Sequence, residues 1–410
     1  MSEFRIDLHN AVYSLSNALD LVGITHINHG KRVAYIATEI AKGLGWKEGR
    51  LDRLLRAAIL HDCGVSKTEV HAQLAQFAWE HESEHCVEGA RLLRSTPLLA
   101  DLAEMVRYHH THWSDLVASD VDEETRYNAN CIYLADRIDI LTYQALQSDP
   151  DILASRENIR KIIFERRGTW FNPEMVDSFM HLSRSEAFWF VLERDLVSGH
   201  LESWLTRSQP VALPFAELRS LVHLFSYVVD AKSHYTKQHS DGVASLARYL
   251  GERLSLSERE CDTLELAGLL HDIGKLRIPD YILEKREKLT AKESMVMMRH
   301  SFDTFNILKD IPGLEDVAEW ATQHHERLDG EGYPYKLAGS EISLAVRIIA
   351  VADVFQALMQ DRPYRGPMTK TEMLKVLDGE AAKGRLDAAV IACVEANFDE
   401  CWNAGLPDPK

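Results

Sequence analysis

The chain has 410 residues, of which 46% are apolar and 27% charged, and it carries a net charge of −17. This length and balance predict two globular domains, or three, with sizeable cores. The excess of 63 acidic over 46 basic residues argues against a protein that binds DNA or RNA polymers, which would present a basic face. A small anionic ligand is still compatible, because bound divalent metals and a few local basic side chains can reverse the field in a pocket.

The N-terminal residues, the apolar runs and the cysteines indicate in which compartment of the cell the protein resides. Residues 1–7 show no basic stretch followed by an apolar core, so we expect no signal peptide. No uninterrupted apolar run approaches the ~20 residues that span a bilayer. The six cysteines contain no C-x-x-C pair, which favours reduced thiols over a disulfide framework. We therefore expect a cytoplasmic protein that does not enter the membrane.

Helical periodicity dominates the chain. Apolar side chains recur at helical spacing first in residues 32–41 and later in residues 243–250. Residues 264–270 form another apolar segment that runs into a His-Asp doublet, and Gly274 follows where a helix end favours the left-handed conformation. No run alternates clearly enough to predict a sheet. The predicted fold class is all-α.

An internal repeat divides the chain. Residues 8–62 align without a gap with residues 218–272, and the correspondence continues after an insertion in the second copy. Gly168, late in the first copy, has a counterpart in Gly384. The aligned residues of metal-ligand type are His29/His239, His61/His271, Asp62/Asp272, His85/His300, His109/His324, His110/His325 and Asp136/Asp353. Such an ordered series indicates two tandem copies of one helical bundle.

The predicted joint between the copies is the segment of residues 208–214, where two prolines interrupt the helical pattern. We therefore predict one domain of residues 1–207 and a second of residues 208–410.

The second copy carries most of the chemistry. Residues 271–275 read His-Asp-Ile-Gly-Lys, and residues 324–334 read His-His-Glu-Arg-Leu-Asp-Gly-Glu-Gly-Tyr-Pro. Asp353 lies inside an apolar run, where an unpaired charge would be costly unless a cation or a donor met it. Histidine nitrogen together with carboxylate oxygen suits iron, manganese or similar divalent metals better than thiolate-preferring ions.

These motifs resemble the HD-GYP phosphodiesterases, a branch of the HD metal-dependent phosphohydrolases. The resemblance implies two divalent ions, because Tyr235 stands where three-metal members carry a glutamate. Iron or manganese is expected, with magnesium, nickel or another divalent ion as alternatives. Gln356 departs from the aspartate that the family usually has at this position. The implied ligands are His239, His271, Asp272, His300, His324, His325 and Asp353.

The resemblance also implies a reaction. A hydroxide held between the two ions would attack phosphorus and open a cyclic dinucleotide, cyclic di-GMP or 3′,3′-cyclic GMP-AMP, to the linear dinucleotide. Asp272 and Lys275 would be catalytic, and nothing in the residues distinguishes guanine from adenine. Arginine suits phosphate because its donors are planar and bidentate. The expected substrate contacts are Lys275, Arg362, Arg365, Gly332, Tyr333 and Pro334.

Two other functions stay open. One is an HD phosphohydrolase that acts on other nucleotides, against which the Gly-Tyr-Pro turn and the arginine pair count. The other is a dinucleotide sensor or docking protein without turnover, against which the complete ligand set and Lys275 count. The resemblance further implies a homodimer and the docking of signalling proteins through the Gly-Tyr-Pro loop.

The first copy keeps a full ligand set but lacks its surroundings. Val65 stands in the place of Lys275, and neither the Gly-Tyr-Pro turn nor an Arg-Pro-Tyr-Arg segment is present. Three interpretations remain: a metal-loaded regulatory or dimerising domain, a second phosphohydrolase of different specificity, or remnant ligands around an empty core. Its candidate metal ligands are His29, His61, Asp62, His85, His109, His110 and Asp136.

Overall fold

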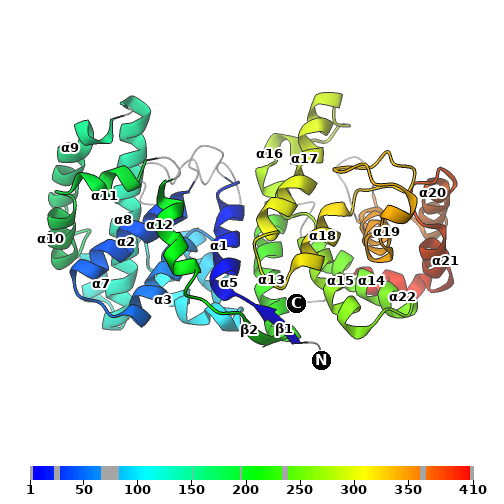
Figure 1. Ribbon diagram of the computed structural model, residues 1–410, viewed down its shortest axis with the longest axis horizontal. Coiled ribbons are helices and arrows are strands. Elements are labelled where there is room, and N and C mark those ends of the chain that lie inside the picture. Colours follow the sequence, from blue (N-terminus) through cyan, green and yellow to red (C-terminus); the bar gives the residue numbers. More distant parts are fainter. Residues whose placement is uncertain are drawn as a thin grey trace. The chain divides into compact units, whose positions relative to one another are not determined.

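The structure, a computed structural model, describes residues 3–22, 28–65, 83–149, 151–193, 196–232, 239–360 and 366–406. The chain divides by its internal contacts into two compact units (Figure 1). The N-terminal unit is Leu8–Gln209, and the C-terminal unit is Pro210–Lys410 together with Met1–Asp7. None of the described helices is both long and apolar enough to cross a membrane.

The described part of the N-terminal unit is helical throughout, and the 26-residue α8 is its longest element. Its elements are α1 (Leu8–Leu19), α2 (His29–Gly43), α3 (Glu48–Ile59), α5 (Ser83–Arg94), η1 (Pro97–Leu102), α6 (Ala103–Arg107), α7 (Trp113–Ala118), α8 (Glu123–Ser148), α9 (Ile152–Phe164), α10 (Pro173–Leu182), α11 (Glu186–Val191) and α12 (Leu196–Leu205).

The C-terminal unit is also helical, apart from one pair of short strands. Its elements are β1 (Glu3–Ile6), β2 (Val211–Pro214), α13 (Phe215–Asp230), α14 (His239–Arg253), α15 (Glu258–Leu270), η2 (Ile273–Arg277), α16 (Asp280–Leu283), α17 (Ala291–Leu308), α18 (Glu315–Gln323), η3 (Gly339–Glu341), α19 (Leu344–Met359), α20 (Lys370–Ala382), α21 (Ala388–Ala396) and α22 (Phe398–Gly405). The predicted all-α class is confirmed.

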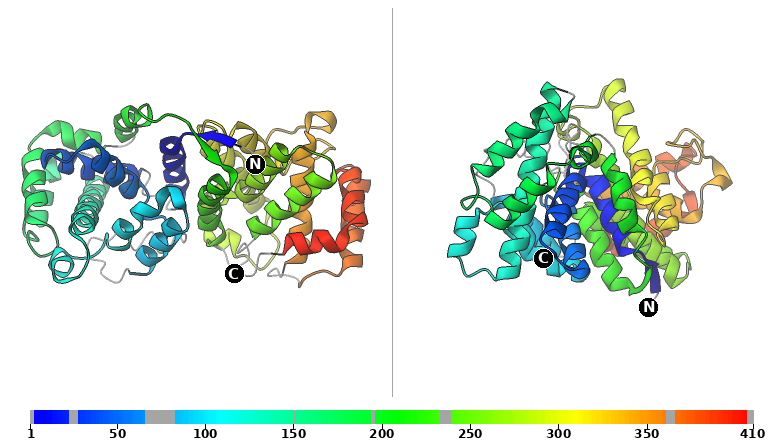
Figure 2. Two further views of the ribbon diagram at one scale, coloured as in Figure 1. Left: turned by 90° about the horizontal axis from the view of Figure 1, so that it is seen from below. Right: turned by 60° about the vertical axis from the view of Figure 1, so that its left-hand side comes forward.

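The strand pair is a feature that the sequence did not reveal. β1 and β2 pair antiparallel, with Glu3 opposite Pro214 and Ile6 opposite Val211 (Figure 2, blue beside green). Phe4 and Ile6 point into the core while their neighbours are exposed, but four residues are too few for alternation to be recognised. The pair ties the start of the chain to the C-terminal unit, and the predicted boundary after residue 207 stays a prediction.

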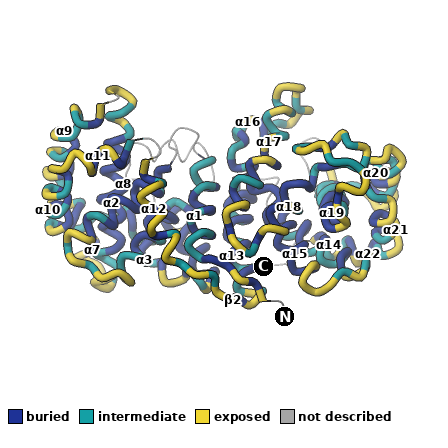
Figure 3. Tube along the Cα trace, viewed as in Figure 1, coloured by how far each residue is buried: buried dark blue, intermediate teal, exposed yellow. Residues whose placement is uncertain are grey.

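The two units share one pattern of helix packing. In the N-terminal unit α2 packs on α3 and α8, and α5 packs on α6. The equivalent helices of the C-terminal unit repeat these pairings, since α14 packs on α15 and α19, and α17 packs on α18. Most residues of α2, α14 and α19 are buried, whereas α20 has only two buried residues (Figure 3). The repeat in the sequence is therefore also a repeat in the structure.

Helix caps place the ends of the helices that carry the site. Ser257 and Glu260 form a capping box at the start of α15, and Thr290 and Glu293 form one at the start of α17. The Ser343 hydroxyl accepts a hydrogen bond from the Val346 amide and caps α19. The capping box at Ser257 fixes where α15 begins, and this helix ends directly before the doublet His271–Asp272.

Gly274 differs from the expectation. It lies in the 3₁₀ helix η2 rather than in a left-handed helix end, so that prediction is wrong. The reason for glycine is close packing, because a Cβ atom here would lie 2.0 Å from the His300 carbonyl oxygen of α17. Gly64 repeats this approach in the N-terminal unit, where a Cβ atom would lie 2.1 Å from the His85 carbonyl oxygen.

We expect the substitution Gly274→Ala to push α17 away from η2 and to destabilise the protein by about 1–3 kcal/mol, the usual effect of overpacking. Thermal and chemical unfolding measure this loss. The control is Gly379→Ala in α20, where a Cβ atom meets nothing within 4 Å. That change should stabilise the helix by about 0.5–1 kcal/mol. Equal unfolding midpoints for the two variants would contradict the packing argument.

Candidate metal centre

The first donor group of the C-terminal unit joins three helices. His239 is the first residue of α14, His271 follows the last residue of α15, and Asp353 projects from α19. Their ligand atoms lie within 4.8 Å of one another. The Asp353 Oδ1 atom is 3.2 Å from His239 Nε2 and 4.0 Å from His271 Nε2. Two nitrogens and one carboxylate oxygen thus face a common centre.

The second donor group consists of three histidines. His300 comes from α17, His324 directly follows α18, and His325 is the next residue. Their ligand atoms also lie within 4.8 Å of one another, and the Nε2 atoms of His300 and His324 are 3.4 Å apart. Helix ends α15 and α18 thus each deliver a histidine to the same region.

Asp272 lies between the two groups. Its Oδ2 atom is 3.3 Å from His271 Nε2 and 3.8 Å from His239 Nε2. Its Oδ1 atom is 3.5 Å from His300 Nε2 and 4.0 Å from the Nε2 atom of His324. One carboxylate therefore faces both groups. The structure brings all seven residues that the sequence singled out in this unit into one cluster, and their role as ligands stays a prediction.

Backbone carbonyls orient the rings. The Nδ1 atoms of His271, His300 and His324 hydrogen bond to the carbonyl oxygens of the residues three positions earlier, at 2.6–2.7 Å. Carbonyls in the last turn of a helix lack intrahelical partners, so a ring just after α15 or α18 satisfies one of them. When Nδ1 carries the proton, the lone pair of Nε2 faces the cluster, as metal ligation requires.

His239 has a different partner. Its Nδ1 atom is 2.5 Å from Oε1 of Gln356, one turn beyond Asp353 on α19. In the N-terminal unit the equivalent bond joins His29 Nδ1 to Asp139 Oδ2 at 2.7 Å. Gln356, whose role the sequence left open, thus replaces a carboxylate with a neutral acceptor.

The cluster fits a bound cation. The Nε2 atom of His271 and the Oδ1 atom of Asp272 are buried and have no hydrogen-bond partner among the described residues. Buried polar atoms without partners are rare because each one costs free energy. A divalent metal would satisfy both atoms at once, and the nitrogen and oxygen donors around them suit such an ion.

Protonation states favour the same conclusion. Burial lowers the pKa of His300 to about 4 and that of His325 to about 3, and it also lowers the pKa of His239. Although burial acts to raise the pKa of Asp272, the charges of His271 and Lys275 hold it well below its usual range. At neutral pH His239, His300 and His325 are therefore unprotonated beside an ionised carboxylate, the forms that bind metals, whereas the negative charge of Asp272 raises the pKa of His271 despite its burial.

The Gly-Tyr-Pro loop lies against the second donor group. The Tyr333 ring centroid is 4.8 Å from that of His325 and 6.2 Å from that of His300. Gly330 has a positive φ of 77°, as expected for this turn, whereas Gly332 allows the loop to pass close to the backbone of Glu326. The Tyr333–Pro334 peptide bond is cis.

Glu326 is a residue whose role the sequence did not reveal. Its buried carboxylate accepts hydrogen bonds from the backbone amides of Tyr335 at 2.6 Å and Leu337 at 3.1 Å. The carboxylate thereby fixes the return of the loop next to the histidine pair. A charged residue directly after two ligand histidines was a signal for such a role, but its backbone partners were not visible in the sequence.

Lys275 is the other charged residue at the cluster. Its Nζ atom lies 2.5 Å from Asp272 Oδ2, and its side chain is partly exposed. Arg362, Arg365 and Tyr235 lie outside the described residues.

The N-terminal unit holds a matching cluster of its seven candidate residues. The Nε2 atom of His61 and the Oδ1 atom of Asp62 are again buried without a hydrogen-bond partner among the described residues. Asp136 differs in its surroundings, since Arg137 donates to its Oδ2 atom at 2.6 Å. Val65 stands in the place of Lys275, so Asp62 has no lysine at the equivalent position of the sequence.

Comparison with known proteins supports this assignment of two related units. Family models described as the HD domain match residues 27–141 and residues 223–390. The 3′3′-cGAMP-specific phosphodiesterase 1 of Vibrio cholerae is 37% identical over 412 residues, which cover 99% of this chain and 95% of that protein. The cyclic di-GMP phosphodiesterase response regulator RpfG of Xanthomonas campestris is 38% identical over 170 residues, 41% of this chain and 44% of that protein.

A solved structure has the same fold. The crystal structure of a cyclic GMP-AMP specific phosphodiesterase of V. cholerae, V-cGAP3, superposes with a TM-score of 0.63 at 24% identity, covering 97% of this chain and 98% of that one. The two HD-domain matches and the full-length relative agree with the two clusters of candidate metal ligands. The chain therefore belongs to the HD-domain phosphodiesterases, in their HD-GYP branch.

Proposed function

We propose that the C-terminal unit hydrolyses a cyclic dinucleotide to the linear dinucleotide, and that it prefers 3′,3′-cyclic GMP-AMP over cyclic di-GMP. The observation that carries the proposal is Asp272, a buried carboxylate that faces two donor groups with one oxygen each. The substrate preference is supported by the V. cholerae relative, named 3′3′-cGAMP-specific, which matches this chain through both units.

The donor groups support two divalent ions, iron or manganese by the preference of nitrogen and oxygen ligands. The first group would hold one ion and the second group the other, with Asp272 shared between them. When bound, the ions would supply activated water and offset negative charge on the phosphate. A cytoplasmic location, a homodimer and the docking of partners through the Gly-Tyr-Pro loop remain predictions.

Lys275 is a cationic side chain at the cluster, in addition to any bound metal. Its ammonium group lies against Asp272 but keeps access to solvent, so it can reach a phosphate bound above the cluster. There it would neutralise a phosphate oxygen or donate a proton to the leaving ribose oxygen. The N-terminal unit lacks this group, which supports turnover in the C-terminal unit alone.

The loop supplies a wall and a hydrogen-bond donor. Burial raises the pKa of the Tyr333 hydroxyl well above its usual value, so the hydroxyl stays protonated and can donate a hydrogen bond. Arg362 and Arg365 remain the predicted phosphate clamps.

The substitution Asp272→Ala tests the proposed function. Removing the shared carboxylate should lower hydrolysis of both dinucleotides by at least about 10³-fold, since metal stabilisation of the transition state is worth several kcal/mol. Rates are measured side by side on 3′,3′-cyclic GMP-AMP and cyclic di-GMP, with manganese- or iron-loaded protein.

The control is Asp378→Ala, which removes an exposed carboxylate from α20 and should leave both rates unchanged. Cleavage of neither substrate by metal-loaded wild-type protein would refute the proposal and favour a sensor or a hydrolase of other nucleotides. Faster cleavage of cyclic di-GMP would overturn the substrate preference only.

The substitution Gln356→Leu tests how His239 is held. Without the Oε1 acceptor the Nδ1–H group of His239 loses its partner, and metal affinity should fall by about 10–100-fold, as for other outer-shell partners. Competition with a chelating dye measures the affinity. Gln356→Glu keeps an acceptor oxygen and should retain affinity. Unchanged binding in the leucine variant would show that the bond does not orient the ring.

A further inference from the structure

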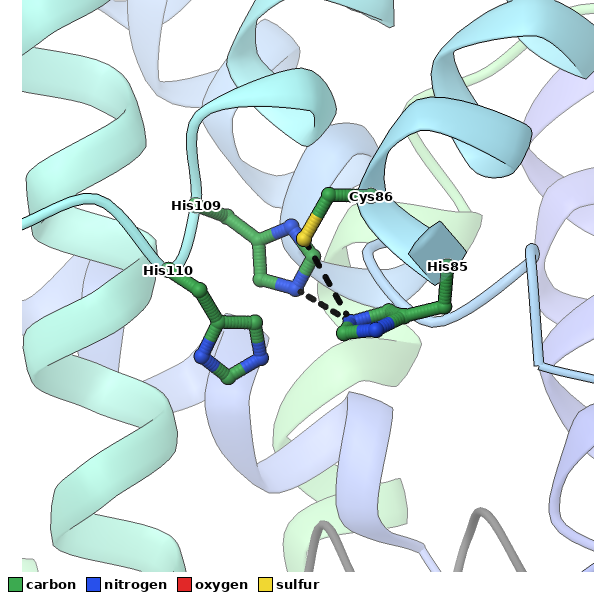
Figure 4. A group of neighbouring side chains, drawn as sticks. All are labelled: His85, Cys86, His109 and His110. Atoms are coloured by element: carbon green, nitrogen blue, oxygen red, sulfur yellow. Dashed lines mark hydrogen bonds between the residues drawn. The ribbon is translucent and has the colours of Figure 1, made fainter. Parts of the chain in front are cut away.

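A cysteine accompanies three histidines in the N-terminal unit. His85 and Cys86 are neighbours on α5, and His109 and His110 follow α6 (Figure 4). The four side chains turn toward one another, and their ligand atoms lie within 4.8 Å of one another. His85, Cys86 and His109 are buried, and His110 is partly buried.

The spacing of these donors fits a tetrahedral ion. The Nε2 atoms of His85 and His109 are 3.4 Å apart, and Cys86 Sγ is 3.5 Å from His85 Nε2 (Figure 4, dashed lines). Two ligands on a tetrahedral zinc ion, with bonds of about 2.0–2.3 Å, lie roughly 3.3–3.8 Å apart. The His109 Nδ1 atom bonds to the Val106 carbonyl oxygen at 2.6 Å, which leaves Nε2 of the neutral ring for an ion.

A second observation also indicates a cation. Asp62 Oδ1 is buried without a hydrogen-bond partner among the described residues. It lies 3.5 Å from His85 Nε2 and 3.9 Å from His109 Nε2. A carboxylate oxygen without a hydrogen-bond partner thus lies close to two of these imidazoles, and a cation held by the histidines would offset its negative charge.

The two units differ at the position of this thiol. Ser301 occupies the place of Cys86 in the C-terminal unit, and its Oγ atom is 3.4 Å from His300 Nε2, almost the same separation. A hydroxyl is a poor ligand for a borderline ion such as zinc, whereas a thiolate is a strong one. The change from serine to cysteine therefore alters which metal the cluster selects.

We propose that His85, Cys86, His109 and His110 bind one zinc-type divalent ion through three nitrogens and a thiolate. A site with four protein ligands is closed and structural, whereas a catalytic site keeps a position open for water or substrate. The ion would hold α5 against the segment after α6. Among the three interpretations of the first copy, this one makes it a metal-loaded domain without turnover of its own.

Cobalt substitution tests the proposal on the full-length protein. The protein is stripped with a chelator and titrated with Co²⁺, and the near-ultraviolet thiolate-to-cobalt charge-transfer band is recorded. Wild-type protein should show the band, and Cys86→Ser should lose it. The control is Cys131→Ser, since the buried Cys131 thiol donates to the Ala37 carbonyl oxygen instead and its loss should leave the band intact.

Bound cobalt without a charge-transfer band in wild-type protein would overturn the proposal, and so would a band that persists in Cys86→Ser. Zinc K-edge absorption of wild-type protein gives a measurement without any variant, and it should show a sulfur neighbour at about 2.3 Å. Asp272→Ala should keep the cobalt band while hydrolysis is lost. The two proposals can therefore fail independently.

Discussion

The burial of the Asp272 carboxylate is the constraint on which the site depends. An ionised carboxylate loses several kcal/mol of hydration when it is buried, and it must recover this from charge or hydrogen bonds. One oxygen has Lys275, but the other faces two histidine nitrogens and no donor among the described residues. Histidines lie around this oxygen because α15 and α18 end beside it and because α17 approaches closely at Gly274. The fold thus gathers histidine nitrogens around a buried carboxylate oxygen without a hydrogen-bond partner among the described residues, and a cation would complete this cluster.

Much of this centre could be predicted from the sequence because its ligands are defined by their own chemistry. The same histidines and aspartates recur in one order in the two copies, and this repeat identifies the residues of the cluster. Helical periodicity predicts the bundle that joins them. Contacts between distant segments were not predictable in this way. β1 meets β2 across some two hundred residues of chain, and each strand is too short to show a pattern. Glu326 acts on backbone amides nine and eleven residues away, where no side-chain signal exists.

Charge explains how the two copies diverged. In the N-terminal unit Asp139 is paired with Arg32 at 2.5 Å, and Arg137 neutralises Asp136. In the C-terminal unit Gln356 stands in the place of Asp139, Gly242 in that of Arg32 and Val354 in that of Arg137. Both ion pairs are therefore absent there. A Cβ atom on Gly242 would lie 2.6 Å from the Gly405 carbonyl oxygen and 2.9 Å from Gln356 Nε2, so the glycine makes room for α22 as well as for the amide. The guanidiniums reduce the negative potential around Asp136, and with it the attraction for an ion in the first donor group of that copy.

Divergence of the first copy was also limited by what a buried site can lose. Lys275 is partly exposed and the Gly-Tyr-Pro loop lies beside the cluster, so their replacement in the first copy removes groups that are not buried between the candidate ligands. The histidines and Asp62 are different, because removing any one of them would take a polar neighbour away from another buried polar atom. The two copies therefore differ in groups at the edge of the cluster and share the buried candidate ligands. Cys86, where the C-terminal unit has Ser301, adds a donor to the shared cluster in a side chain of similar size. The burial of the candidate ligands is therefore sufficient to account for their presence in the N-terminal unit.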